Sequence, residues 1–328
     1  MESFFVLNAA HLHLVLNHVP TLGMAVGLAL LLLALIRRHE VLVHVGLEVL
    51  FVIALVTLPV YVTGAAAYAH LRSGADFSDI SARMHQDVAL TGFAVTEFAG
   101  FIAWVALWQS RRTGRAGRGL VAAATVLSII ALAIMGRAAT LGGEIHHPEI
   151  RAAAAAAAAA APVVGTDGQK IDVTDQFVAA RISRYMVNST WAWPAAETVH
   201  FLGLSLSFGM LLAINLRLLG VMPQVAFADM HRLLPWAMLG FGANLITGML
   251  FFVGQPGQYV DSPPFHWKVV FLMIAGANFL YLTVFKKAWS EDGINSRFAD
   301  KAMAISSMVA WLIVLYAGRM LPFLGNAF

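Results

Sequence analysis

The stretch VLNHVPTLGMAVGLALLLLALIRR, residues 15–38, decides the class of this protein. From 15 to 36 it contains no aspartate, glutamate, lysine or arginine. About 20 consecutive apolar residues in a helix cross the hydrocarbon core of a bilayer. Arg37 and Arg38 then end the run, as positive residues do on the cytoplasmic side of a membrane span. The stretch therefore predicts a transmembrane helix.

Seven further stretches have the same length and character, and the whole chain shares their composition. Of the 328 residues, 59% are hydrophobic and 12% are charged, whereas soluble domains carry about 25% charged residues. We expect an all-α integral membrane protein of about eight transmembrane helices. After 15–36, the predicted spans are 42–64, 87–109, 119–141, 196–217, 233–253, 267–286 and 303–323.

The short basic connections set the expected orientation. Arginines and lysines follow the first, third, fifth and seventh spans, and such loops stay in the cytoplasm. With eight spans, both termini then face the periplasm or the outside. The basic residues lie between apolar runs, so they indicate topology and a lipid environment and do not suggest nucleic-acid binding.

Three regions follow from the spacing of the spans: a four-helix bundle at 1–142, a connection at 143–193 and a second four-helix bundle at 194–328. Ten consecutive alanines, Ala152–Ala161, lie in the connection. They either form a short helix or stand for unidentified residues, and the sequence leaves this open. The stretch Val173–Met186 has apolar residues at helical spacing and is predicted to lie on the membrane surface.

The two halves repeat one set of residues. Two histidines and an arginine that follows glycine recur in the same order: His18, His85 and Arg137, then His200, His266 and Arg319. The two histidines are 67 residues apart in one half and 66 in the other, and the first histidine precedes the arginine by 119 residues in both. We interpret this as a tandem duplication with both copies in the same orientation.

Each set is expected to lie in one layer near the periplasmic face, because its histidines begin inward spans and its arginine ends an outward span. Two histidines that face each other across a helical bundle suit the two axial positions of a haem iron. An arginine matches a haem propionate with two parallel hydrogen bonds. The chain has no cysteine, which excludes thiolate ligands and covalent haem attachment. We therefore expect about two haem b groups.

Further histidines leave two alternatives open. His70 ends the second span, and His146 and His147 follow the fourth. These two spans lie diagonally across the expected bundle, so a third haem between them would take its ligands from these histidines. The pair His11 and His13 instead suits a copper site, since imidazole also binds copper. Within the spans, Glu48 and Glu97 are candidates for accepting a proton from a quinol.

Several short motifs carry a family resemblance. The first half resembles a bacterial four-helix membrane domain of unassigned function through NHVP at 17–20 and LGGEIHHPEI at 141–150. The second half resembles another such domain through HFLG at 200–203, LRLLG at 216–220, LPWA at 234–237 and AGR at 317–319. More distantly, the layout is similar to membrane subunits of b-type cytochromes and to copper-resistance membrane proteins. The resemblance implies a bacterial inner-membrane protein.

The sequence thus predicts a membrane-embedded b-type cytochrome subunit that transfers electrons between the quinone pool and a periplasmic partner. We expect an electron-transfer subunit of a complex more than a stand-alone enzyme. A copper-binding or copper-transport protein and a structural anchor of a larger complex are the alternatives that the sequence leaves open.

Overall fold

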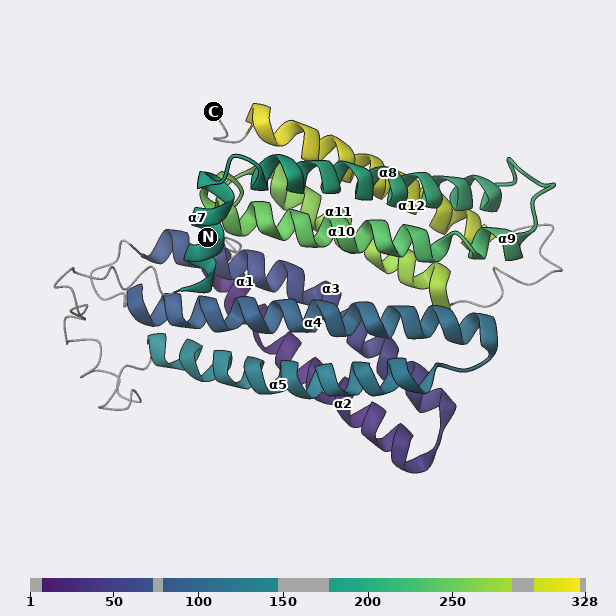
Figure 1. The fold of residues 1–328 in the computed structure, drawn as a ribbon, viewed down its shortest axis with the longest axis horizontal. Coiled ribbons are helices and arrows are strands. Elements are labelled where there is room, and N and C mark those ends of the chain that lie inside the picture. The colour runs from purple at the N-terminus through teal and green to yellow at the C-terminus, as the bar shows by residue number, and fades with distance from the viewer. Residues whose placement is uncertain (1–7, 73–78, 147–176, 285–297, 325–328) are drawn as a thin grey trace, which may run out of the picture.

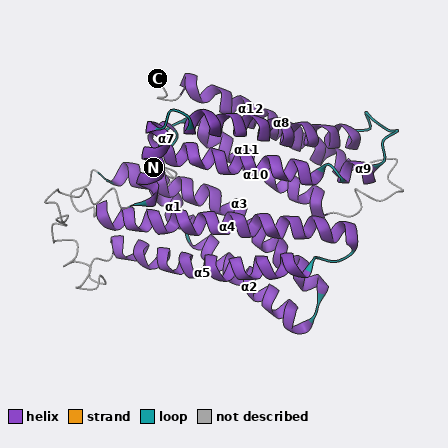
Figure 2. Cartoon of the chain, in the orientation of Figure 1, coloured by secondary structure: helices purple, strands orange, loops and turns teal. Residues whose placement is uncertain are grey.

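The computed structural model describes residues 8–72, 79–146, 177–284 and 298–324, which form helices joined by loops, with no strand among them (Figures 1 and 2). The first group of helices is α1 (Ala9–Leu16), α2 (His18–Arg37), α3 (Glu40–Leu71), α4 (Asp79–Thr113) and α5 (Arg118–His146). The others are α7 (Val178–Asn188), α8 (Ala192–Leu218), α9 (Phe227–His231), α10 (Leu234–Gly254), the 3₁₀ turn η3 (Pro256–Gln258), α11 (Pro263–Val284) and α12 (Phe298–Leu324).

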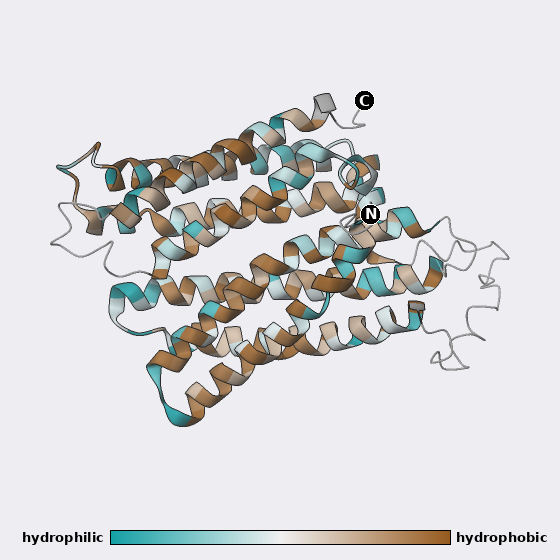
Figure 3. Cartoon of the chain, turned by 180° about the vertical axis from the view of Figure 1, so that it is seen from behind, coloured by the Kyte–Doolittle hydropathy of each residue, from teal (hydrophilic) through white to brown (hydrophobic). Residues whose placement is uncertain are grey.

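Eight of the described helical stretches are long and apolar enough to cross a membrane, and each predicted span falls on one of them. The first of these stretches, Ala9–Arg37, joins α1 to α2 through Asn17. Hydrophobic residues run along the long helices, and hydrophilic residues gather towards their ends (Figure 3). Large apolar side chains such as Leu22, Leu202 and Ile246 are exposed on the outside. The all-helical, multi-span prediction is therefore confirmed at this level.

The helices of the two halves pack differently. In the first half, α3 packs along both α2 and α4, α4 packs along α5, and the short α1 lies on α3. In the second half, α10 packs along α8, α11 packs along α12, and α12 also contacts α8, whereas α10 and α11 meet mainly through aromatic side chains. From the first half, α4 packs against α10 and α11, and α3 packs against α11.

Trp104 of α4 lies at the centre of the contact between the halves. Its side chain is 1% exposed and its ring meets Phe51, Phe241 and Phe279. The indole Nε1 donates a hydrogen bond of 2.9 Å to Oγ1 of Thr283 on α11. One aromatic residue of the first half thus packs between the second-half helices α10 and α11.

The bundle has two distinct ends, which we name by the short helices found there, the α7 end and the α9 end (Figure 1). Helix α7 lies across the long helices, and two hydrogen bonds hold it there. The Ala179 amide donates to Oδ1 of Asp87 on α4 at 3.0 Å, and Ser183 donates to the Gly254 carbonyl of α10 at 2.6 Å.

Helix α7 lies within and just beyond the helical stretch predicted at Val173–Met186: it begins at Val178 and ends at Asn188, and its place on a membrane surface stays a prediction. Residues 173–176 and the alanine tract Ala152–Ala161 lie outside the described residues.

Candidate functional site

His13 and His85 form a pair near the α7 end of the first half. His13 lies on α1 and His85 lies in the second turn of α4. Their ring centroids are 6.5 Å apart, and the ring planes make an angle of 74°. Both side chains are half-buried. Two imidazoles from sequence positions 72 residues apart therefore meet at one place in the bundle.

The backbone of a neighbouring helix holds each ring of the pair. Nδ1 of His13 lies 3.0 Å from the Val60 carbonyl of α3, and Nδ1 of His85 lies 2.8 Å from the Ala138 carbonyl of α5. A carbonyl oxygen only accepts, so each Nδ1 carries the proton and donates it. Each Nε2 then has a free lone pair, and neither makes a hydrogen bond within the described part of the chain.

This pattern is characteristic of ligand histidines. Metal-ligating histidines almost always donate their second ring N–H to a carbonyl or a carboxylate, which fixes the tautomer and the ring orientation.

Two glycines make room for the two rings. A Cβ at Gly64 of α3 would lie 2.8 Å from Cε1 of His13, and a Cβ at Gly142 of α5 would lie 3.2 Å from Cε1 of His85. At Gly64 an added Cβ would force the His13 ring to shift, and at Gly142 the fit against His85 would be tight. Helices α3 and α5 each supply one carbonyl acceptor and one glycine, and α1 and α4 supply the imidazoles.

The spacing of the pair fits two ligands of one metal centre. Imidazole nitrogens bind metals from about 2 Å, and the ring centre lies about 1 Å further out, so ligands on opposite sides of one metal have ring centres about 6 Å apart. The observed 6.5 Å agrees with this value. Two imidazoles match a haem, in which the porphyrin itself supplies four nitrogen ligands to iron.

The structure brings His85 beside His13, while the sequence repeat had suggested His18 as its partner. His18 is exposed at the start of α2 and makes no hydrogen bond, ion pair or ring contact with the described residues. Arg137 is exposed on α5, next to the Ala138 carbonyl that accepts from His85. Its neighbour Gly136 faces open space.

His200 occupies a comparable place in the second half. Its Nδ1 lies 2.8 Å from Oγ1 of Thr247 on α10, and that hydroxyl donates to the Ala243 carbonyl at 2.7 Å. His200 is therefore the donor in the first contact, and its Nε2 keeps a lone pair. Gly248 lies beneath the ring, with a Cβ position 3.8 Å from Cε1. This arrangement parallels His13 above Gly64, but no second histidine ring lies against His200 among the described residues.

His266 and Arg319 are both exposed and lie on α11 and α12. Nε2 of His266 donates to the Val260 carbonyl at 2.8 Å, so this ring is held by the turn that precedes its own helix. The residue of α11 that turns towards α12 is Lys268, whose Nζ lies 3.5 Å from a Cβ position at Gly318.

The histidines predicted for a third haem have other surroundings or are not described. His70 forms an ion pair of 3.2 Å with Asp261, and both side chains are 58% exposed. The side chain of His146 and the whole of His147 lie outside the described residues. His11 is exposed, and in the described chain no three histidine, aspartate or glutamate side chains gather as a metal site.

Glu97 is a partly buried carboxyl group in the middle of α4. Its Oε1 is buried and has no hydrogen-bond partner among the described residues. It lies 12 positions after His85 in the chain, about 18 Å further along α4 at 1.5 Å per residue. Glu97 is therefore not a ligand of the histidine pair.

Sequence reasoning placed His13 outside the first span and assigned it only to a surface copper site. One sequence signal lay close to the pair: Gly142 falls in the stretch 141–150 that carries the resemblance of the first half. Comparison with protein-family models, with curated proteins and with solved structures found no match, so any function proposed for the chain rests on the site itself.

Proposed function

We propose that the chain is a membrane-embedded b-type cytochrome subunit that carries electrons between the quinone pool and a partner at the α7 end. The observation that carries this proposal is the pair of His13 and His85, with both Nδ1 atoms held by backbone carbonyls and the ring centroids 6.5 Å apart. Haem b, held by these two histidines, would supply one-electron redox chemistry.

The residues around the pair would orient the cofactor and tune it. The carbonyls of Val60 and Ala138 fix the tautomers and raise the basicity of the ligand nitrogens. Arg137, next to Ala138 in sequence, is the cation nearest along α5 for a propionate. Glu97 remains a proposed proton acceptor for a quinol within the membrane.

The membrane orientation is part of the same proposal. The connections at the α9 end carry Arg37, Arg38, Arg111, Arg112, Arg115, Arg118, Arg217 and Arg232. By the positive-inside rule this end would face the cytoplasm. The pair would then lie near the periplasmic face of a bacterial inner membrane, within reach of a periplasmic electron-transfer partner.

The sequence repeat is the basis for proposing a second haem in the C-terminal half. His200 and His266 would be its ligands, and Arg319 would bind a propionate. The parallel placement of His13 over Gly64 and His200 over Gly248 supports His200. Measuring the number of haems per chain distinguishes a single site in the first half from one site in each half.

The test is a reduced-minus-oxidised visible spectrum of the detergent-purified protein with pyridine haemochrome quantitation. We expect a b-type spectrum in which the haem of the first half is lost or converted to high spin in His13→Gln and in His85→Gln, while any haem of the second half keeps its spectrum. His18→Gln is the matched control, because His18 is an exposed histidine only five positions away. Retention of the spectrum in His13→Gln together with its loss in His18→Gln would restore the pairing of His18 with His85.

A protein purified with its full cofactor complement that contains no iron would overturn the cytochrome proposal. Copper bound in its place, and lost in His13→Gln, would favour the copper-binding alternative.

A further inference from the structure

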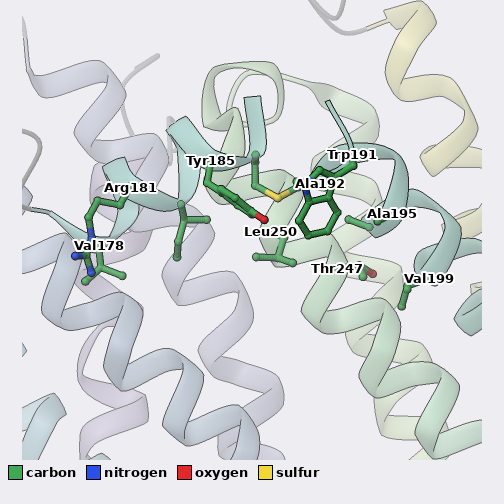
Figure 4. A pocket seen from close by; sticks show the side chains of 12 residues that line it. Val178, Arg181, Tyr185, Trp191, Ala192, Ala195, Val199, Thr247 and Leu250 are labelled. Carbon is green, nitrogen blue, oxygen red and sulfur yellow. The ribbon is translucent and has the colours of Figure 1, made fainter. Parts of the chain in front are cut away.

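An apolar groove runs beneath α7 and between α8 and α10 (Figure 4). Its volume is about 520 Å³, within the range of about 300–1,000 Å³ that small-molecule sites occupy. Arg181 and Tyr185 of α7 stand on one side, Ala195 and Val199 of α8 stand on the other, and Leu250 of α10 lies between them (Figure 4).

Small side chains and a fixed cover create the groove. Three alanines of α8, Ala192, Ala195 and Ala196, line it where larger residues would close it. The hydrogen bonds of Ala179 to Asp87 and of Ser183 to Gly254 hold α7 above the space. The groove is therefore present without any ligand.

The depth of the groove matches one leaflet of a bilayer. Along α8 it reaches from Ala192, the first residue of the helix, to Val199, seven residues or about 10 Å. Half of the hydrocarbon core is about 15 Å thick. Tyr185 and Trp191 stand at the upper level, where aromatic residues mark the membrane interface.

Cationic groups stand at the mouth. Arg181 lines both the groove and a smaller adjoining depression, which Arg184, Tyr185, Asn188 and Ser189 complete. Arginine binds phosphate with two parallel hydrogen bonds. Below the mouth the walls are almost entirely apolar, and the Thr247 hydroxyl at the floor is already engaged with His200 and Ala243.

We propose that this groove binds an anionic phospholipid, with its phosphate between Arg181 and Arg184 and an acyl chain along Ala195, Val199 and Leu250. A quinone ring carries two carbonyl oxygens that need hydrogen-bond donors. The Thr247 hydroxyl at the floor of the groove already donates to the Ala243 carbonyl, so the floor suits an acyl chain better than a quinone ring. The inference depends on the chain spanning a membrane, and it is independent of the haem site.

The experiment titrates the full-length, delipidated protein in detergent with phosphatidylglycerol and counts bound lipids by native mass spectrometry. Phosphatidylcholine, which has no net charge, is the comparison lipid. We expect tight binding of one phosphatidylglycerol to the wild type. The double variant Arg181→Gln and Arg184→Gln should bind it about 30-fold more weakly, since each cation contributes to the attraction of an anionic lipid.

Three further variants make the test specific. Arg72→Gln removes an exposed arginine at the same end of the bundle that does not line the groove, and should bind like the wild type. Replacement of Arg181 and Arg184 by lysine should restore part of the binding. Ala195→Phe should fill the groove and abolish tight binding, while circular dichroism shows unchanged helix content.

Equal binding by the double glutamine variant and the wild type would overturn the proposal. So would tight binding that survives in Ala195→Phe, because the lipid would then sit outside the groove. Recovery of a quinone that phosphatidylglycerol does not displace, and that Ala195→Phe loses, would assign the groove to a quinone instead.

Discussion

At Gly64, a methyl group would lie 2.8 Å from Cε1 of His13, a distance that real Cβ contacts do not reach. The imidazole would have to move, and its Nδ1 would leave the Val60 carbonyl. At Gly136 of the neighbouring α5, a Cβ would meet nothing within 4 Å. Two helical glycines of the same half therefore have opposite tolerance for one added carbon atom.

We predict that Gly64→Ala lowers the affinity of the chain for haem about tenfold, the low end of the loss seen when an outer-shell partner of a metal ligand is disturbed. Gly136→Ala should keep the wild-type affinity and raise the stability of α5, because alanine favours a helix by about 1 kcal/mol over glycine. Haem titration of the apoprotein, followed by absorbance, measures both. Equal affinities in the two variants would contradict the role assigned to Gly64.

The histidine pair shows how far sequence reasoning reaches at this scale. His85 was singled out, because a histidine that begins an apolar span is a candidate for the bundle interior. His18 was preferred to His13 as its partner, because His18 matches His200 in the repeat. Five residues correspond to about 1.4 helical turns, so His13 and His18 face different sides. Spacing along the chain does not specify which side chain of the first helix faces inward, and the structure places His13 beside His85 and leaves His18 exposed.

Helix α4 is the element that joins the two halves, and Trp104 is its main contact. The buried indole touches aromatic side chains of α3, α10 and α11 and donates to Thr283. Phe241 of α10 and Phe279 of α11 also contact each other, at 6.2 Å between ring centroids, so Trp104 completes an aromatic cluster that joins three helices.

We predict that Trp104→Ala destabilises the protein by about 3–5 kcal/mol, the usual cost of truncating a buried aromatic residue. Trp104→Phe should cost less, because the ring contacts remain and Thr283 still donates to the Phe279 carbonyl. Trp236→Ala is the matched control, because this indole is 56% exposed on α10 and should change stability by no more than about 0.5 kcal/mol. Reversible unfolding in mixed micelles measures the stability of each variant. Similar losses of stability in Trp104→Ala and Trp236→Ala would refute the prediction.

The long elements were predictable from the sequence, and their packing was not. Runs of about 20 apolar residues identify spans by themselves, so every predicted span falls on a helix. The first helix begins at Ala9, earlier than the predicted residue 15, because His11 and His13 lower the hydropathy of a turn that is nevertheless helical. The packing of α10 and α11 around Trp104 has no signature in hydropathy, because hydropathy does not specify which helices contact each other.

For the whole molecule, the absence of cysteine makes the proposed topology directly testable. Asn188 is exposed at the α7 end, and Val221 is exposed in the loop before α9. We predict that a membrane-impermeant maleimide added to intact cells labels Asn188→Cys and leaves Val221→Cys unlabelled until the membrane is opened. The opposite pattern would invert the orientation, and labelling of both positions in intact cells would contradict the eight-span arrangement.

All parts of the histidine pair come from one continuous stretch of chain. His13, Gly64, His85 and Gly142 all precede the end of α5 at His146, and the hydrogen bonds and glycine contacts described for the pair stay within the first half. During synthesis, a ribosome that has delivered α1 to α5 into the membrane has already provided every group that would hold the proposed haem. If haem binds there, its insertion would not need to wait for the synthesis of α8.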